Sequence, residues 1–225
     1  TWYTALGHTK ETYAEPLFRT HLAEGILWAA NAKLPEGTRP LPLDEWHSKG
    51  WNATPNGFHN GQNGPNLASK DLFDDLFVSL EFKVPKGGNS GVYLMGRYEI
   101  QILDSHGVPD ADLKSSMCGS VYERWKDDKG YEGKPPLVNA ARPAGEWNRY
   151  DMVFRAPRFR NGKKTENARF VEVRLNGVVV QRNVEVTGPT RASMFEDEKP
   201  AGPLMLQGDH GPVEYRNVRV KPLRL

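Results

Sequence analysis

Several polar side chains in the middle of the sequence fall at spacings that suit the binding or cleavage of a polar ligand. Arg97, Glu99 and Gln101 alternate with apolar residues, so a strand there places all three on one face. Charged and amide groups supply the paired donors and acceptors that vicinal hydroxyl groups need. We therefore predict that Arg97 and Gln101 bind a polyhydroxylated ligand and that Glu99 is catalytic, with Arg97 orienting it or lowering its pKa. An ordinary solvated strand face is the alternative.

A second pair of polar residues follows the end of the same strand. Asp104 and His106 lie two residues apart, where a loop could present them to a ligand. An aspartate and a histidine at this spacing can act as an orienting carboxylate and a general base. We predict a catalytic His106 and a substrate-binding Asp104, against the alternative that the pair has no role in a site.

A third cluster follows the apolar run at 204–206. Gln207 is predicted to bind substrate, and Asp209 and His210 are predicted to be catalytic. Arg216, further along the chain, is added as a substrate-binding residue on the same face, with a role in bracing this turn as its alternative. For Asp209 and His210 the alternative is stabilisation of a tight turn through hydrogen bonds to the backbone.

These acidic and imidazole groups could also hold a divalent metal ion that acts as a Lewis acid. The residues that could supply ligands are His106, His210, Glu99, Asp104 and Asp209. Because no HxH or HExxH spacing occurs, the metal ligands stay unassigned. Ser90 lies in GNSG, which lacks the glycine spacing of a GxSxG nucleophile elbow, so a serine hydrolase is not expected.

The elements that must position these residues are short strands bounded by turn residues. They are predicted at 76–84, 91–95, 98–103, 149–155, 170–175, 178–181, 203–207 and 213–220. Asn176-Gly177 between two apolar runs is a strong hairpin signal. No long helical pattern interrupts this set, so we predict an all-β sandwich of two antiparallel sheets. Trp147 and Phe154 are expected in its core, and Glu123 to Trp125 with Tyr131 at one end of the binding face.

The first third of the chain has a different character. A strand followed by a helix is predicted for residues 1–33. Residues 34–66 are rich in Pro, Gly and Asn, which predicts a linker or extended loop. Trp46 and Trp51 are expected to pin this segment to the sandwich. The run at 6–30, LGHTKETYAEPLFRTHLAEGILWAA, resembles the C-terminal end of trehalose-utilisation-type domains, which have a glutamine-amidotransferase-like fold. We expect a longer native polypeptide whose preceding domain is missing here, which leaves His8 without a pocket. The alternative is that this strand and helix have become an N-terminal appendage of the sandwich.

Composition narrows the partners. The 30 basic and 28 acidic residues give a formal net charge of +2 in 225 residues, and there is no long basic run. We therefore expect a neutral binding partner and no nucleic-acid binding. Cys118 is the single cysteine, which excludes an intrachain disulfide. No apolar stretch approaches the ~20 residues that span a bilayer. The six Trp residues suit sugar binding as well as a core.

Four motifs in order carry a resemblance over the rest of the chain. They are GGNSGVYLMGRYEIQILDS (87–105), NAARPAGEWNRYDMVFRAPR (139–158), RFVEVRLNGVVVQRNVEVTGPT (169–190) and GPLMLQGDHGPVEYRNVRVKPL (202–223). Residues 67–225 resemble the 3-keto-disaccharide hydrolase family. The resemblance implies a concanavalin A-like jelly roll that binds sugars. It also implies that the protein is secreted or exported to the periplasm. This sequence departs from the family's LQDHG-type element by an inserted Gly208, which puts the register of Asp209 and His210 in doubt.

The resemblance also implies a reaction. A ketone at position 3 of a sugar acidifies the hydrogen on carbon 2, so a base can form an enolate that expels the group on carbon 1. His106 or Glu99 would be the base, Arg97, Gln101 or a metal would stabilise the enolate, and Asp209 with His210 would be the acid. A conventional glycosidase with Glu99 and Asp209 as its two carboxylates, and a carbohydrate-binding module without catalysis, are the alternatives.

Overall fold

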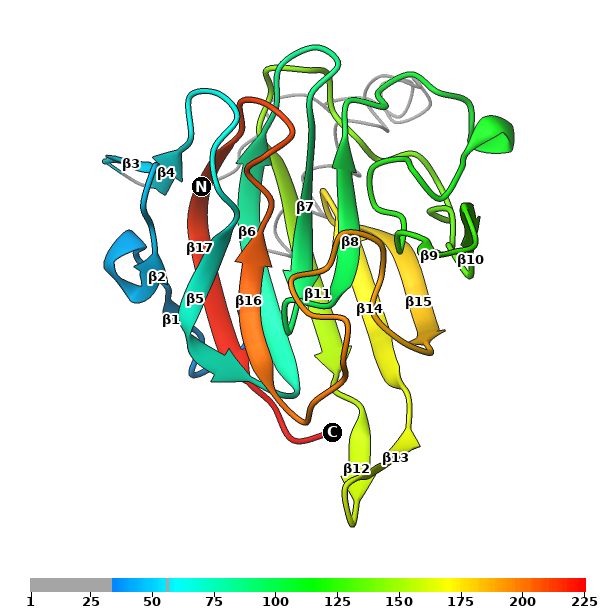
Figure 1. Ribbon diagram of the computed structural model, residues 1–225. Helices are drawn as coiled ribbons and strands as arrows, with labels where there is room; N and C mark the ends of the chain where they lie inside the picture. The colour runs from blue at the N-terminus through cyan, green and yellow to red at the C-terminus, as the bar shows by residue number, and fades with distance from the viewer. Residues whose placement is uncertain (1–33, 56) are drawn as a thin grey trace, which may run out of the picture. The chain divides into compact units, whose positions relative to one another are not determined.

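The computed structural model describes residues 34–55 and 57–225, and a compact unit runs from Arg39 to Leu225 (Figure 1). The strand and helix predicted for 1–33, together with His8, lie outside the described residues. Within the described part the regular structure consists of strands and two short 3-10 turns, Leu43–Glu45 and Asp110–Asp112. Every strand pair in it is antiparallel. The predicted all-β antiparallel sandwich is confirmed.

The strands form two sheets and two separate hairpins. The larger sheet runs in the order β15 (Val178–Val186), β14 (Ala168–Leu175), β11 (Asn148–Arg155), β6 (Leu76–Lys83), β17 (Glu214–Pro222), β4 (Gly57–His59) and β3 (Asn52–Thr54), with β1 (Arg39–Pro40) beside β17. The smaller sheet is β2 (Trp46–His47), β5 (Leu67–Phe73), β16 (Gly202–Leu206), β7 (Asn89–Leu94) and β8 (Tyr98–Leu103). The hairpins are β9 (Arg124–Lys126) with β10 (Lys129–Tyr131), and β12 (Arg158–Arg160) with β13 (Lys163–Glu166).

The core lies between the two sheets, which appear one in front of the other in Figure 1. Alternation along β8 turns Tyr98, Ile100 and Ile102 inward, and all three are fully buried, as the sequence predicts. The Tyr98 ring packs on Phe154 of β11 with 5.4 Å between ring centroids. Burial of such side chains is the main favourable contribution to folding, at about 25 cal/mol per Å² of apolar surface. The same alternation leaves Arg97, Glu99 and Gln101 on the outer face of the smaller sheet.

The turn between β14 and β15 is the hairpin that the sequence indicates. Asn176 and Gly177 both have positive φ, 53° and 86°, the backbone that a two-residue turn needs to match the strand twist. The Asn176 side chain also accepts a hydrogen bond from the Arg149 backbone at 2.9 Å, which ties the turn to β11. The strand register on both sides of this turn is thereby fixed.

Residues 39–59 contribute strands to both sheets, which differs from the extended loop expected for 34–66. Trp46 and Trp51 are 2% and 7% exposed, and the Trp51 ring meets Phe58 edge to face. The prediction that these two tryptophans pin the segment to the sandwich is confirmed. Their rings fill one edge of the core, so the short strands around them are held by side-chain burial despite a sequence rich in turn residues.

Trp147 is on the outer face of the larger sheet, so the prediction of a core position is wrong. Asn148, the first residue of β11, points inward and is 4% exposed, and parity therefore turns its neighbour Trp147 outward. The Arg216 guanidinium stacks over the Trp147 ring at 3.9 Å from its centroid, and the Lys83 amine lies at 5.0 Å. The ring is half-buried by these two cations.

Candidate functional site

A row of side chains crosses the outer face of the smaller sheet. Met205 of β16 pairs with Tyr93 of β7, and Tyr93 pairs with Glu99 of β8. Beyond β8 the chain at Tyr122 continues the row, since its backbone N–H donates to the Glu99 carbonyl at 3.1 Å. Residues opposite each other on adjacent antiparallel strands share a face. Glu99 therefore lies between two tyrosines.

The loop that joins β15 to β16, residues 187–201, closes over this part of the sheet. Figure 1 shows it crossing in front of β7 and β8. Thr190 donates its backbone N–H to the Arg97 carbonyl at 2.9 Å, and Met194 donates to Gly96 at 2.9 Å. The Thr190 hydroxyl accepts from the Glu99 backbone at 3.2 Å. Under this cover, Glu99 is only 1% exposed.

Burial of the Glu99 carboxyl changes its acidity. Desolvation raises the pKa of Glu99 from 4.5 to about 8, because a carboxylate loses its hydration there. A hydrogen bond from Tyr93 opposes this rise, and the negative charge of Asp209 adds to it. Glu99 Oε2 has no hydrogen-bond partner within the described part of the chain. The expectation that Arg97 would lower the pKa of Glu99 is wrong.

A glycine makes room for this carboxyl. Gly91 faces the same side as Tyr93, and a Cβ added to it would lie 2.2 Å from Glu99 Oε1. Atoms at that separation overlap, so a larger residue here must displace the carboxyl. The position of Glu99 thus depends on the absence of a side chain on the neighbouring strand.

The Arg97 side chain binds the β15–β16 loop. Its guanidinium donates to the Asp197 carboxylate at 2.6 Å, to the Asp197 carbonyl at 2.5 Å and to the Met95 carbonyl at 2.9 Å. The ring of Phe195 stacks against it at 4.5 Å. Arg97 is 3% exposed, so the structure places its donors on the loop and not beside the Glu99 carboxyl.

Gln101 and Gln207 flank Gly91, and Gln101 is two residues along β8 from Glu99. Gln101 pairs with Gly91 across β8 and β7, and the Gln207 backbone donates to the Gly91 carbonyl at 2.9 Å from the other side. Both side chains belong to the outer face and both are 5% exposed. The structure thus brings two predicted substrate-binding amides next to the predicted catalytic carboxyl.

Asp209 and His210 lie at the end of β16 and are the solvent-facing members of the cluster. His210 Nδ1 is 2.6 Å from Asp209 Oδ1. The inserted Gly208 is explained by packing, since a Cβ there would lie 2.4 Å from the Pro65 carbonyl. The Asn60 amide donates to the Gly208 carbonyl at 2.7 Å and fixes the turn. Asp209 lies near enough to Glu99 for its charge to act on the carboxyl.

Three predicted site residues have structural partners elsewhere. Asp104 accepts a hydrogen bond from the Gly87 backbone at 2.9 Å. His106 Nδ1 contacts the Ala141 carbonyl at 2.9 Å, in the loop beyond the end of β8. Arg216 is on the outer face of the larger sheet, where its Nε donates to Glu81 at 2.8 Å. The structure does not bring these three side chains to Glu99.

Two neighbours of Glu99, Tyr93 and Tyr122, and Arg191 beside them were not among the predicted site residues. Tyr93 could have been found from alternation, because it has the parity of Gly91 in β7. Tyr122 and Arg191 gave no sequence signal, since both lie in irregular segments. The Arg191 guanidinium stacks on Trp125 at 3.7 Å from the ring centroid, and its charge lowers the pKa of Tyr122. The expectation that Trp125 lies at one end of the site is consistent with this contact.

No three His, Cys, Asp or Glu side chains of residues 34–55 and 57–225 are grouped to hold a metal ion, so the five residues named as ligand candidates do not form such a centre. The described residues also contain no helix long and apolar enough to cross a membrane.

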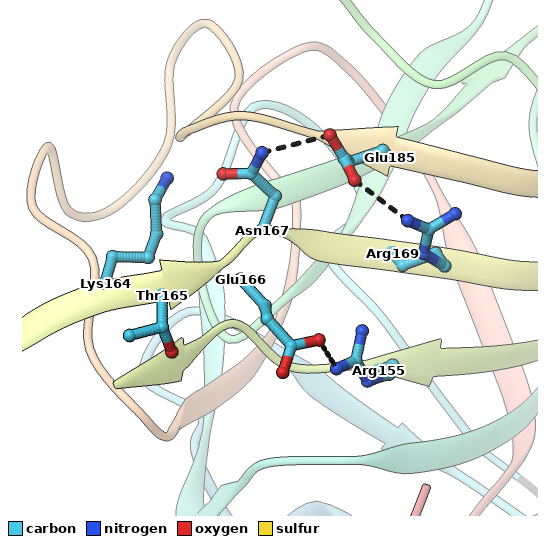
Figure 2. Close-up of a pocket in the computed structure, with 7 residues that line it drawn as sticks. All are labelled: Arg155, Lys164, Thr165, Glu166, Asn167, Arg169 and Glu185. Carbon is cyan, nitrogen blue, oxygen red and sulfur yellow. Dashed lines mark hydrogen bonds and ion pairs between the residues drawn. The ribbon is translucent and has the colours of Figure 1, made fainter. Parts of the chain in front are cut away.

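Two surface clefts lie away from Glu99. One, of about 270 Å³, is shown in Figure 2, where Arg155 pairs with Glu166, and Glu185 binds both Asn167 and Arg169. The other, of about 400 Å³, is bounded by His59, Val84, Pro85 and Pro212 with the Lys83–Glu214 ion pair. In the first the charges neutralise each other, and the second is largely apolar. Neither cleft is lined by Glu99 or by any of the other predicted catalytic residues.

Comparison with known proteins agrees with this architecture. The chain is 28% identical to a solved structure described as a putative glycosyl hydrolase from Parabacteroides distasonis, with a TM-score of 0.65 and coverage of 84% of each chain. A second putative glycosyl hydrolase from that organism matches with a TM-score of 0.59 and 20% identity, over 84% of this chain and all of that one. The fold is the predicted jelly roll, and the protein is of the glycosyl hydrolase-like, carbohydrate-active class.

The family can be stated more narrowly. The chain belongs to the 3-keto-alpha-glucoside-1,2-lyase-like domain family, whose model matches residues 35–221. It is also 26% identical to a 3-keto-disaccharide hydrolase of Bacteroides thetaiotaomicron, over 89% of this chain and 79% of that protein. The resemblance stated from the four motifs is confirmed, and the match begins at 35, well before the predicted start at 67.

Proposed function

We propose that this protein cleaves glycosides that carry a ketone at position 3 of the sugar ring, with Glu99 as the base that removes the proton from carbon 2. The observation that carries the proposal is a buried carboxyl with an unpartnered oxygen and a pKa of about 8, in a chain of this family. A base works best when its pKa is near the working pH. Glu99 meets that condition because of its burial.

The proposed reaction has two steps. First, Glu99 takes the proton from carbon 2, the electron pair of that C–H bond forms a carbon–carbon double bond to carbon 3, and the ketone becomes an enolate. The enolate returns its electrons to form the ketone again, a double bond forms between carbons 1 and 2, and the bond from carbon 1 to the leaving oxygen breaks. An acid supplies a proton to that oxygen. In the second step water adds across the new double bond and gives the free 3-keto sugar.

The remaining roles follow the positions of the side chains around Glu99. Asp209 and His210 are hydrogen-bonded to each other and half-exposed, so we assign the pair as the acid at the leaving oxygen. The Gln101 and Gln207 amides flank Gly91 and can bind sugar hydroxyls, with the Gln101 NH2 as donor because its Oε1 accepts from the Ile102 backbone N–H at 3.1 Å. The structure favours Glu99 over His106 as the base, because the His106 ring contacts the Ala141 carbonyl.

The test compares a 3-keto disaccharide with its unoxidised parent in D2O. We expect cleavage of the keto substrate with deuterium incorporated at carbon 2, and loss of both cleavage and exchange in Glu99→Gln. Glu81→Gln is the matched control, since Glu81 pairs with Arg216 on the other sheet. Turnover by Glu99→Gln at the wild-type rate would refute the assignment, and binding of sugar without turnover of either substrate would make the domain a binding module.

A conventional two-carboxylate glycosidase is the second candidate. Its support is that Glu99 is largely protonated at neutral pH, as a general acid must be, and that the Asp209 carboxylate acts on it electrostatically. Such an enzyme would cleave the unoxidised parent, whereas the elimination route requires the ketone. The same pair of substrates therefore separates the two mechanisms.

A further inference from the structure

Tyr122, on the side of Glu99 away from Tyr93, has a hydrogen-bonding environment that the proposed base does not use. Its backbone N–H donates to the Glu99 carbonyl at 3.1 Å, so its position follows that of the base. Burial and the nearby charges of Glu99 and Glu123 raise the pKa of Tyr122. The phenol therefore keeps its proton at neutral pH and is available as a donor.

The Arg191 guanidinium changes the acidity of the Tyr122 hydroxyl. The charge of Arg191 acts on Tyr122, and because a guanidinium has only donors, the phenol oxygen can only be the acceptor between the two groups. This contact lowers the pKa of Tyr122 and so opposes the effect of burial. A phenol whose oxygen accepts from a cation is a stronger donor through its own O–H, because hydrogen bonds in a chain polarise one another.

Arg191 is held in place by three contacts. Its guanidinium lies 3.7 Å from the centroid of the Trp125 ring, a close cation–π stack. Its backbone N–H donates to the Glu123 carbonyl at 2.9 Å, and its carbonyl is 3.4 Å from the Tyr93 hydroxyl oxygen. Arg191 thus joins the β15–β16 loop to the β9 hairpin and to both tyrosines beside Glu99.

The proposed reaction needs a donor at the ketone oxygen when the base acts on carbon 2. Negative charge develops on that oxygen, and preorganised donors at such a position contribute strongly to catalysis. Carbons 2 and 3 are bonded neighbours, so the base and this donor must also be neighbours. Arg97, the cation expected in this role, directs its donors to Asp197 and Met95.

We propose that the Tyr122 hydroxyl donates the hydrogen bond that stabilises the enolate oxygen, and that Arg191, stacked on Trp125, is the positioning residue that orients and strengthens this donor. Tyr122 keeps its proton throughout, so the proton balance of the reaction is unchanged. This inference rests on the proposed function and adds to it the residue that recognises the 3-keto group.

The test uses Tyr122→Phe, Arg191→Ala and Arg191→Lys in the full chain, with a 3-keto disaccharide as substrate. We expect Tyr122→Phe to lower kcat by about 10²- to 10³-fold with little change in KM, because the lost hydrogen bond strengthens as charge develops. Deuterium exchange at carbon 2 should fall in parallel. Tyr98→Phe, which removes a hydroxyl that bonds Glu198 from the inner face of β8, is the control and should leave kcat unchanged.

Arg191 should respond as a residue that acts through Tyr122. Arg191→Ala should lower kcat less than Tyr122→Phe does, and combining the two substitutions should cost no more than Tyr122→Phe alone. Arg191→Lys should recover part of the loss, since an ammonium also donates to the phenol oxygen.

The outcomes separate this inference from the function on which it rests. Tyr122→Phe with wild-type kcat, or with a raised KM and unchanged kcat, would overturn the role of Tyr122 while leaving Glu99→Gln inactive and the function intact. Fully additive losses in the double variant would overturn the role of Arg191. Wild-type turnover by Glu99→Gln would overturn the function and this inference together.

Discussion

Replacement of Glu99 by glutamine should stabilise the protein, and the gain should depend on pH. In the unfolded chain the carboxyl ionises at about 4.5, whereas in the folded protein its pKa is about 8. Between these values the folded state binds one more proton than the unfolded state. Stability linked to this group therefore falls as pH rises from 4.5 to 8, and above pH 8 the full penalty of a buried carboxylate applies.

The size of the effect follows from the shift. Each pKa unit corresponds to about 1.4 kcal/mol, so a rise from 4.5 to about 8 costs about 3 kcal/mol at pH 7, about 4 kcal/mol at pH 8 and about 5 kcal/mol well above pH 8. Glutamine has nearly the shape of the protonated acid and carries no charge. The free energy of unfolding of Glu99→Gln should thus match the wild type near pH 4.5 and exceed it by about these amounts at pH 7 and 8.

Urea unfolding of both proteins at a series of pH values from 4.5 to 8.5 measures this difference directly. Glu81→Gln is the control, because it removes an ion pair with Arg216 on the other sheet and should give no gain. A difference between Glu99→Gln and the wild type that stays constant across the series would show that Glu99 ionises normally. The basis of the proposed base would then be removed.

Other substitutions test separate parts of the site. If Glu99 is the base, kcat/KM for a 3-keto substrate should rise tenfold per pH unit below a pKa near 8 and level off above it, and a flat profile would argue against this. Gly91→Ala, whose Cβ would overlap the carboxyl, should lower kcat at least tenfold while the circular dichroism spectrum stays native. Arg97→Ala should reduce the unfolding free energy by about 2 kcal/mol and speed proteolysis of the 187–201 loop, because its buried acceptors lose their donors. Trp147→Ala, which loses the Arg216 stack on the opposite sheet, should cost about 1 kcal/mol in thermal unfolding and leave kcat unchanged.

Local sequence patterns determined most of the fold. Alternation of apolar residues is a property of the chain itself, so it identified the strands and the inward faces of Tyr98, Ile100 and Ile102. The hairpin was predicted from the residues Asn176-Gly177, because the positive φ angles that the turn needs are a local requirement that these two residue types meet. The core position predicted for Trp147 was wrong because the face on which its side chain lies depends on where β11 begins. Strand boundaries are poorly determined by sequence.

The site was determined partly by sequence and partly by tertiary structure. Strand parity alone placed Glu99 and Gln101 on one outer face. The apolar run before Gln207 indicated a second strand that contributes residues to the same site. Which polar residues meet there depended on contacts between segments about 20 to 100 residues apart, such as Arg97 with Asp197 and Glu99 with Tyr122. The raised pKa of Glu99 comes from desolvation by burial and from the charge of Asp209, and both exist only once these segments have packed together.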